Sequence, residues 1–185
     1  PAIGGKDSMS GTYTDSEREI SVAPTLVAFA LTTADAGKVV STDFKKAGSS
    51  VYLIPALRNE YDLPDFNKLK INYSRIFKLA VKRRILAASV VKTGGIAAAI
   101  SKMCFGSMTG FRFDESFFNK YTDEIFDLSY GSIILEVNEC ENPGELFDGI
   151  DHILVGKTES SGSIFAGGNE ISLDSALKAW SDTLE

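Results

Sequence analysis

The stretch ILAASVVKTGGIAAAISKMCFG, residues 85–106, carries the strongest fold signal in the chain. Its apolar first part, residues 85–91, predicts a buried strand, and apolar residues recur at helical spacing after Gly94 and Gly95. The stretch therefore predicts a strand, a tight turn and a buried helix ending near Gly106. The glycine pair permits a positive φ, and it lets another main chain or a phosphate approach the free N–H groups of the helix N-terminus. Close packing of helix on sheet explains the same glycines without a ligand.

The segments around this stretch alternate between strand and helix patterns. Strands are predicted at 50–55, 110–113, 132–137 and 152–156, with a hairpin turn at 167–169, and helices from about residue 65, at 142–147 and at 173–184. Residues 117–128 fit a helix or a pair of turns, with Phe117, Phe118, Tyr121 and Phe126 in the core. This alternation predicts a mixed α/β layer domain.

Two of the predicted helices carry an apolar face. In the helix after residue 65 this face consists of Phe66, Leu69, Tyr73, Ile76, Phe77 and Ala80, and the basic residues Lys68, Lys70, Lys78 and Lys82 form a solvated face. In the last helix we expect Leu173, Leu177, Trp180 and Leu184 to point inward.

The region before residue 49 is different in character. Residues 21–31 predict a strand that begins at Pro24, and a domain boundary fits between residues 38 and 49. Residues 4–10 read GGKDSMS, which gathers backbone N–H groups, the Lys6 cation, the Asp7 carboxylate and the Ser8 hydroxyl. A phosphate or metal–phosphate site requires these groups. The spacing is not that of a Walker A loop, and a plain surface turn explains the segment equally well.

Composition excludes several classes of function. The chain has 185 residues, is 44% hydrophobic and carries a net charge of -6, with its basic residues scattered, so nucleic acid is not expected as a partner. It opens at Pro1 with no leader and lacks an apolar run of the roughly 20 residues that a membrane helix needs, so we expect a cytoplasmic piece of a longer polypeptide. The two cysteines, Cys104 and Cys140, predict no disulfide, and the single histidine, His152, reads as the start of a strand.

Three motifs, in their order and separation, resemble one family. They are IGGKDSMS at residues 3–10, VAPTLVAFA at 22–30 and TGGIAAAISKMCFGSMTGF at 93–111. The chain closely resembles phosphoribosylformylglycinamidine synthase, the large glutamine-dependent amidotransferase of purine biosynthesis. The resemblance implies an α/β fold of the aminoimidazole-ribonucleotide synthetase superfamily. Residues 1–40 would be the tail of the second A-type half, and residues 41–185 the second B-type half.

The resemblance also implies an activity. The full enzyme uses ATP to activate the amide oxygen of formylglycinamide ribonucleotide, and ammonia from glutamine then displaces phosphate to give the amidine. ATP and Mg²⁺ are the implied cofactors, and the implied partners are the other synthase halves and the glutaminase domain of the same polypeptide. We expect Lys6, Asp7, Ser8, Gly94 and Gly95 to face nucleotide or phosphorylated substrate, with Asp7 as the metal ligand. No catalytic residue is assigned to this fragment.

One departure from the family pattern lies directly before the glycine pair. Other members carry a His-Asp-x-x-Asp-Gly-Gly type of sequence there, whereas residues 89–95 read SVVKTGG, without histidine or acid. Mg²⁺ prefers oxygen ligands, which valine cannot supply. We therefore predict that this half retains the fold but has lost its own metal–nucleotide centre. Lys92 either replaces a metal's charge near a phosphate or is an exposed loop residue.

The residues leave three interpretations open. The first is an auxiliary half of the synthase that contributes Lys6, Asp7 and Ser8 to a phosphate-facing loop. The second is a structural pseudo-repeat that binds no nucleotide, which Val90 and Thr93 in place of acids favour. The third, a selenophosphate synthetase or thiamine-phosphate kinase, ranks last because the motifs near the N-terminus of those enzymes are missing. The unpaired edge of the strand at 21–31 also fits a homodimer of the fragment.

Overall fold

The computed structural model describes residues 11–22 and 29–182. Contacts divide the chain into two units, residues 1–34 and 35–185. The sequence placed the boundary at residue 40, within the loop that opens the second unit. Each unit is described by itself.

In the first unit, β1 (Gly11–Thr14) and β2 (Glu19–Val22) form an antiparallel hairpin. The Asp15 carboxylate accepts hydrogen bonds from the amides of Glu17 and Arg18 and so closes the turn. The predicted strand at 21–31 is wrong in part, because residues 29–31 lie in no strand and Phe29 and Leu31 are almost fully exposed. Its middle section, like the predicted site residues Lys6, Asp7 and Ser8, lies outside the described residues.

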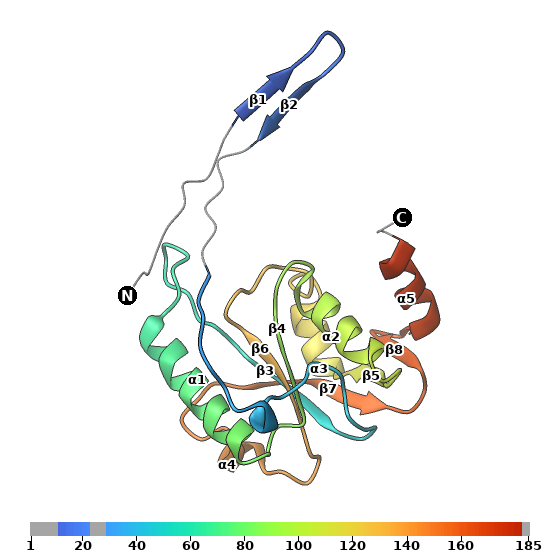
Figure 1. The fold of residues 1–185 in the computed structure, drawn as a ribbon. Coiled ribbons are helices and arrows are strands. Elements are labelled where there is room, and N and C mark those ends of the chain that lie inside the picture. The colour runs from blue at the N-terminus through green and yellow to red at the C-terminus, as the bar shows by residue number, and fades with distance from the viewer. Residues whose placement is uncertain (1–10, 23–28, 183–185) are drawn as a thin grey trace. The chain divides into compact units, whose positions relative to one another are not determined.

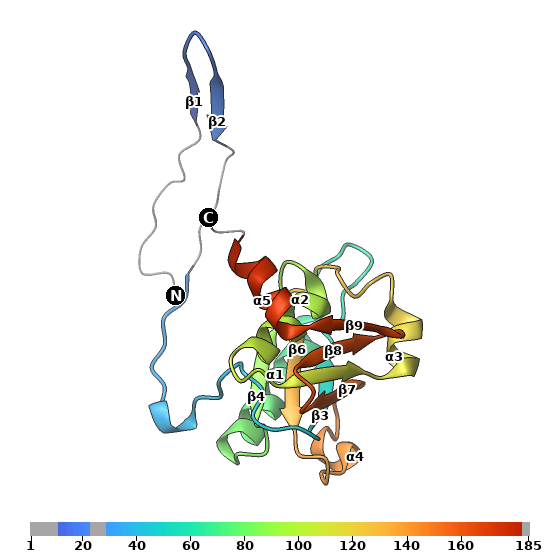
Figure 2. The same ribbon diagram turned by 90° about the vertical axis from the view of Figure 1, so that its right-hand side faces the viewer.

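The second unit is built on a seven-stranded sheet with the order β4-β6-β3-β7-β5-β8-β9 (Figures 1 and 2). Its strands are β3 (Ser50–Ile54), β4 (Ala87–Val90), β5 (Gly110–Phe113), β6 (Ile133–Val137), β7 (Ile153–Glu159), β8 (Ser163–Ala166) and β9 (Asn169–Ser172). Neighbouring strands are antiparallel except for β5 and β8, which are parallel. The predicted mixed α/β class, its strands and the hairpin at 167–169 are confirmed.

Helices cover both faces of this sheet (Figure 1). They are α1 (Phe66–Val81), α2 (Gly95–Phe105), α3 (Glu115–Tyr121), α4 (Pro143–Leu146) and α5 (Leu173–Ser181), and a short 3-10 turn, η1, spans Ala36–Lys38. Residues of α2, α3 and α5 share one hydrophobic cluster with the sheet, whereas α1 and α4 share the other. The sheet therefore separates two apolar layers, and α2 lies over its centre.

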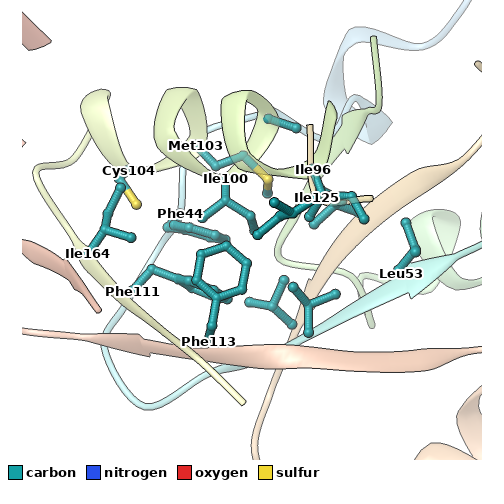
Figure 3. Close-up of a cluster of buried hydrophobic side chains, with 14 of the residues drawn as sticks. Phe44, Leu53, Ile96, Ile100, Met103, Cys104, Phe111, Phe113, Ile125 and Ile164 are labelled. Atoms are coloured by element: carbon teal, nitrogen blue, oxygen red, sulfur yellow. The ribbon is translucent and has the colours of Figure 1, made fainter. Parts of the chain in front are cut away.

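The core beneath α2 is rich in aromatic rings (Figure 3). The fully buried rings of Phe44 and Phe111 stack with their centroids 5.7 Å apart, and Phe113 meets Phe111 edge-on at 5.0 Å. Ile100 and Met103 of α2, both fully buried, belong to the same cluster. Tight packing here fixes α2, and so the turn that precedes it, against the sheet.

The predicted inward faces need three corrections. In α1 the buried residues are Asn72 and Leu79, while Phe66 and Phe77 of the predicted face are 69% and 70% exposed. Phe126 is 68% exposed instead of buried, because the neighbouring Ile125 takes the buried position in the core. In α5 Leu173 is fully buried but Trp180 is half exposed, and Leu184 lies outside the described residues.

The cysteines and the histidine take the predicted places. Both Cys104 and Cys140 are free, the first buried and the second exposed. His152 directly precedes β7, half-buried beside the rings of Tyr52 and Phe147. Within the described residues, no helix is long and apolar enough to cross a membrane.

Candidate functional site

The candidate site is the turn that joins β4 to α2. After the strand, the amide of the buried Val91 donates to the Ser132 carbonyl at 3.0 Å, and the chain emerges at the exposed Lys92 and Thr93. Gly94 then caps α2 with a φ of 85°, and Gly95 opens the helix with a φ of 66°. Residues other than glycine rarely take such angles, so the backbone conformation explains the pair.

A second main chain lies against the start of α2. The Ala97 amide donates to the Ile125 carbonyl at 3.0 Å. A Cβ placed on Gly95 would lie 2.4 Å from that carbonyl oxygen and 2.5 Å from the carbonyl carbon of Phe126. Figure 3 shows the Ile125 side chain beside Ile96 in the core. Gly95 is therefore required by the close approach of residues 125–126.

The turn and its contact with residues 125–126 use backbone N–H donors that a bound phosphate would need. The Gly95 amide donates to the Lys92 carbonyl at 2.9 Å, in addition to the bond from the Ala97 amide to the Ile125 carbonyl. Two of the four first-turn amides, those of residues 94–97, thus already have protein acceptors, where an anion-binding helix N-terminus presents free amides. The turn fits a phosphate poorly in this conformation. Phosphate binding by Gly94 and Gly95 stays a prediction.

The turn also lacks the ligands of a magnesium centre. Residues 89–93 contain no carboxylate, and Thr93 supplies only a hydroxyl and a carbonyl. Across residues 11–22 and 29–182 there is no group of three or more His, Cys, Asp or Glu side chains that could hold a metal ion. Lys6, Asp7 and Ser8 lie outside the described residues, so their part in the site stays a prediction.

A buried carboxylate escaped the sequence reasoning. Glu136 of β6 is fully buried, and its side chain accepts hydrogen bonds from the amides of Lys45 and Lys46 at 2.9 and 3.4 Å. Burial raises the pKa of Glu136, and the two amide hydrogen bonds oppose that rise. The carboxylate holds the loop before β3 against the sheet. The one signal for it in the sequence is an acid inside the apolar strand SIILEV, residues 132–137.

With the fold and the turn described, the chain can be compared with known proteins. No protein-family model and no curated protein sequence matches the chain. Among solved structures, Thermotoga maritima PurL complexed with ADP matches with a TM-score of 0.61 and 9% identity, over 75% of this chain and 27% of that chain. Phosphoribosylformylglycinamidine synthase II from the same organism gives 0.60 and 8% over the same shares, and PurLQS gives 0.60 and 9% over 76% and 28%.

The likeness shows the fold. Over about three quarters of its length, the chain therefore has a mixed α/β fold similar to that of part of PurL. The chain spans little more than a quarter of the length of the structures it matches. At 8–9% identity the match carries no residue-level role from PurL to this chain.

Proposed function

We propose that this chain is an auxiliary piece of an ATP-dependent carbon–nitrogen ligase of purine biosynthesis. The reaction of the whole enzyme would convert formylglycinamide ribonucleotide, ATP and glutamine to the amidine, ADP, phosphate and glutamate. The match to PurL over three quarters of this chain supports the proposal most directly. The motifs at residues 3–10, 22–30 and 93–111 point to the same family. Because the match covers about a quarter of PurL, the remaining halves and the glutaminase domain are its proposed partners.

In this role the chain would contribute binding groups, and the chemistry would lie elsewhere. Lys6 would neutralise phosphate charge, Asp7 would offer a carboxylate to a Mg²⁺ held at the interface with another half of the enzyme, and Ser8 would donate a hydroxyl. Pre-positioned donors of this kind stabilise the charge that develops when a phosphoryl group moves. The turn at Gly94 would add its backbone only if residues 125–126 moved aside.

We further propose that this half has lost its own metal–nucleotide centre. The segment SVVKT before the glycine pair offers no carboxylate, and two of the four first-turn amides of α2, those of Gly95 and Ala97, are already bonded. Lys92 is exposed and has no ion pair with any carboxylate of the described residues, so it is free to meet a phosphate. A cation at that point would replace part of the charge that a metal supplies.

A second candidate function is a structural pseudo-repeat that binds no nucleotide. The bond from Ala97 to Ile125 and the close contact at Gly95 favour it, because they occupy the position where a phosphate would sit. Under this proposal the chain supports a catalytic half elsewhere in the enzyme.

Calorimetric titration with ADP and with formylglycinamide ribonucleotide, both without metal, separates the two candidates. The auxiliary role predicts binding to the 185-residue chain that Lys6→Ala weakens at least about tenfold, the effect of losing one charge-assisted contact. Lys38→Ala, which removes an exposed lysine from η1, is the matched control and should leave the affinity unchanged. Absence of heat with both ligands would reject the auxiliary role and favour the pseudo-repeat.

A further inference from the structure

Helix α1 exposes a row of aromatic side chains along the flank of its packed face. Phe66 and Phe77 are 69% and 70% exposed, and Tyr73 between them is 40% exposed. Separations of seven and four residues place the three rings along one line of the helix surface. The neighbouring face of α1 packs on the sheet through the buried Leu79, with Ile76 and Ala80 half-buried. Phe66 and Phe77 therefore lie beside the packed face and contribute little to the core.

The row borders a preformed groove. A hollow of about 480 Å³ runs along α1, and the residues that line it are Phe66, Leu69, Lys70, Tyr73, Ser74 and Phe77. The Tyr73 hydroxyl donates to the Gly131 carbonyl at 2.9 Å, which fixes one wall. At the start of the helix, the Asp65 side chain accepts from the amides of Asn67 and Lys68 and holds the first turn. This shallow, largely apolar groove is open to solvent, so its rings are accessible to an inserted side chain.

The groove lies in a strongly basic segment of an acidic chain. Residues 66–84 hold seven Lys and Arg and no Asp or Glu, although the whole chain carries -6. Arg75 is bound to the carbonyls of Glu145 and Leu146, and Arg84 pairs with Glu141. By contrast, Lys70, Lys78 and Lys82 form no ion pair with a carboxylate of the described residues. Lys70 lines the groove itself, so the groove favours an acidic occupant.

We propose that α1 is a docking surface for an acidic amphipathic helix of a protein partner. The apolar ridge of the partner would enter the groove between Phe66 and Phe77, and its acidic residues would pair with Lys70 and Lys78. This is the helix-in-groove mode, in which anchors at helical spacing meet an apolar channel. The 16 residues of α1 span about 24 Å, so a partner helix of similar length would cover the row.

Charge decides against one other occupant. A second copy meeting α1 with its own α1 would bring four basic residues against four, which like-charge repulsion disfavours. An anionic lipid surface would satisfy the lysines and take up the exposed rings, so binding to vesicles is an outcome of the test.

The test is fluorescence anisotropy with a labelled synthetic helix of about 18 residues, with leucines on one face and glutamates on both flanks. We expect micromolar binding by the 185-residue chain, weakened by added salt. Phe77→Ala should lower the affinity at least about tenfold, whereas Phe126→Ala, an equally exposed ring elsewhere, should change it less than about twofold. Lys70→Glu with Lys78→Glu should abolish binding, and Lys102→Glu with Lys178→Glu should not. Melting curves by circular dichroism confirm that each variant is folded.

Four outcomes would overturn the proposal. The first is no binding of the acidic helix up to millimolar concentration, and the second is equal binding of a peptide with lysine in place of every glutamate. The third is sedimentation of the chain as a dimer that Phe77→Ala dissociates, which would assign the groove to a second copy. The fourth is binding to phosphatidylserine-containing vesicles that Phe77→Ala abolishes, together with no binding of the peptide, which would assign the surface to a membrane.

Discussion

Replacing Gly95 with alanine tests whether residues 125–126 close the start of α2. The new Cβ would lie 2.4 to 2.7 Å from backbone atoms of Ile125 and Phe126, which cannot rotate away as a side chain can. We expect the left-handed φ of 66° to cost about 1 kcal/mol and the forced backbone shift about 1–3 kcal/mol more. Gly95→Ala should therefore lower the free energy of unfolding by about 2–4 kcal/mol.

Gly168→Ala is the matched control, because its φ of 86° is also left-handed but no atom lies within 4 Å of the new Cβ. It should cost only the conformational part, about 1 kcal/mol. Urea unfolding of both variants and the parent chain, followed by circular dichroism, gives the two differences. If Gly95→Ala costs no more than Gly168→Ala within about 0.5 kcal/mol, the contact with residues 125–126 does not exist in solution.

Three further predictions concern buried groups. Burial raises the pKa of Glu136, so the folded chain keeps that proton to higher pH than the unfolded chain, and the free energy of unfolding falls as pH rises through the raised pKa. Glu136→Gln should remove this fall in urea titrations between about pH 4 and 7. Equal slopes of unfolding free energy against pH in the variant and the parent chain would contradict this. Burial raises the pKa of Cys104 to about 12, so a thiol reagent should modify only Cys140 in the folded chain, and fast reaction that survives Cys140→Ser would refute this. Phe44→Ala removes a fully buried ring stacked on Phe111 and should cost about 3–5 kcal/mol in urea unfolding; a loss below about 1 kcal/mol would contradict the core.

Sequence periodicity predicted the elements better than it predicted their faces. The continuous apolar run at β3 and the glycine pair before α2 each allow one structure, and both are found. In α1 the period was right, but apolar residues surround much of the helix. Hydrophobicity alone cannot distinguish a ring that enters the core from one, such as Phe77, that faces outward on a groove.

The sequence predicted only those features of the candidate site that depend on residues close together in the chain. A positive φ at Gly94 follows from the strand–turn–helix pattern. The bond from Ala97 to Ile125 joins residues 28 apart, and no short pattern encodes such a contact. The hairpin of β1 and β2 was missed for another reason, since each strand has only four residues and the alternation in β2 is too short to identify a strand.

Calorimetric titration of the 185-residue chain with ATP, in the presence of Mg²⁺ and again with a chelator, tests the central claim most directly. The claim is that the chain, whose fold is similar to part of PurL, has no metal–nucleotide centre of its own. The account predicts that any heat of ATP binding is the same with and without Mg²⁺. Micromolar binding that requires Mg²⁺ and vanishes with the chelator would contradict it, and would direct the search for the metal ligand to Asp7.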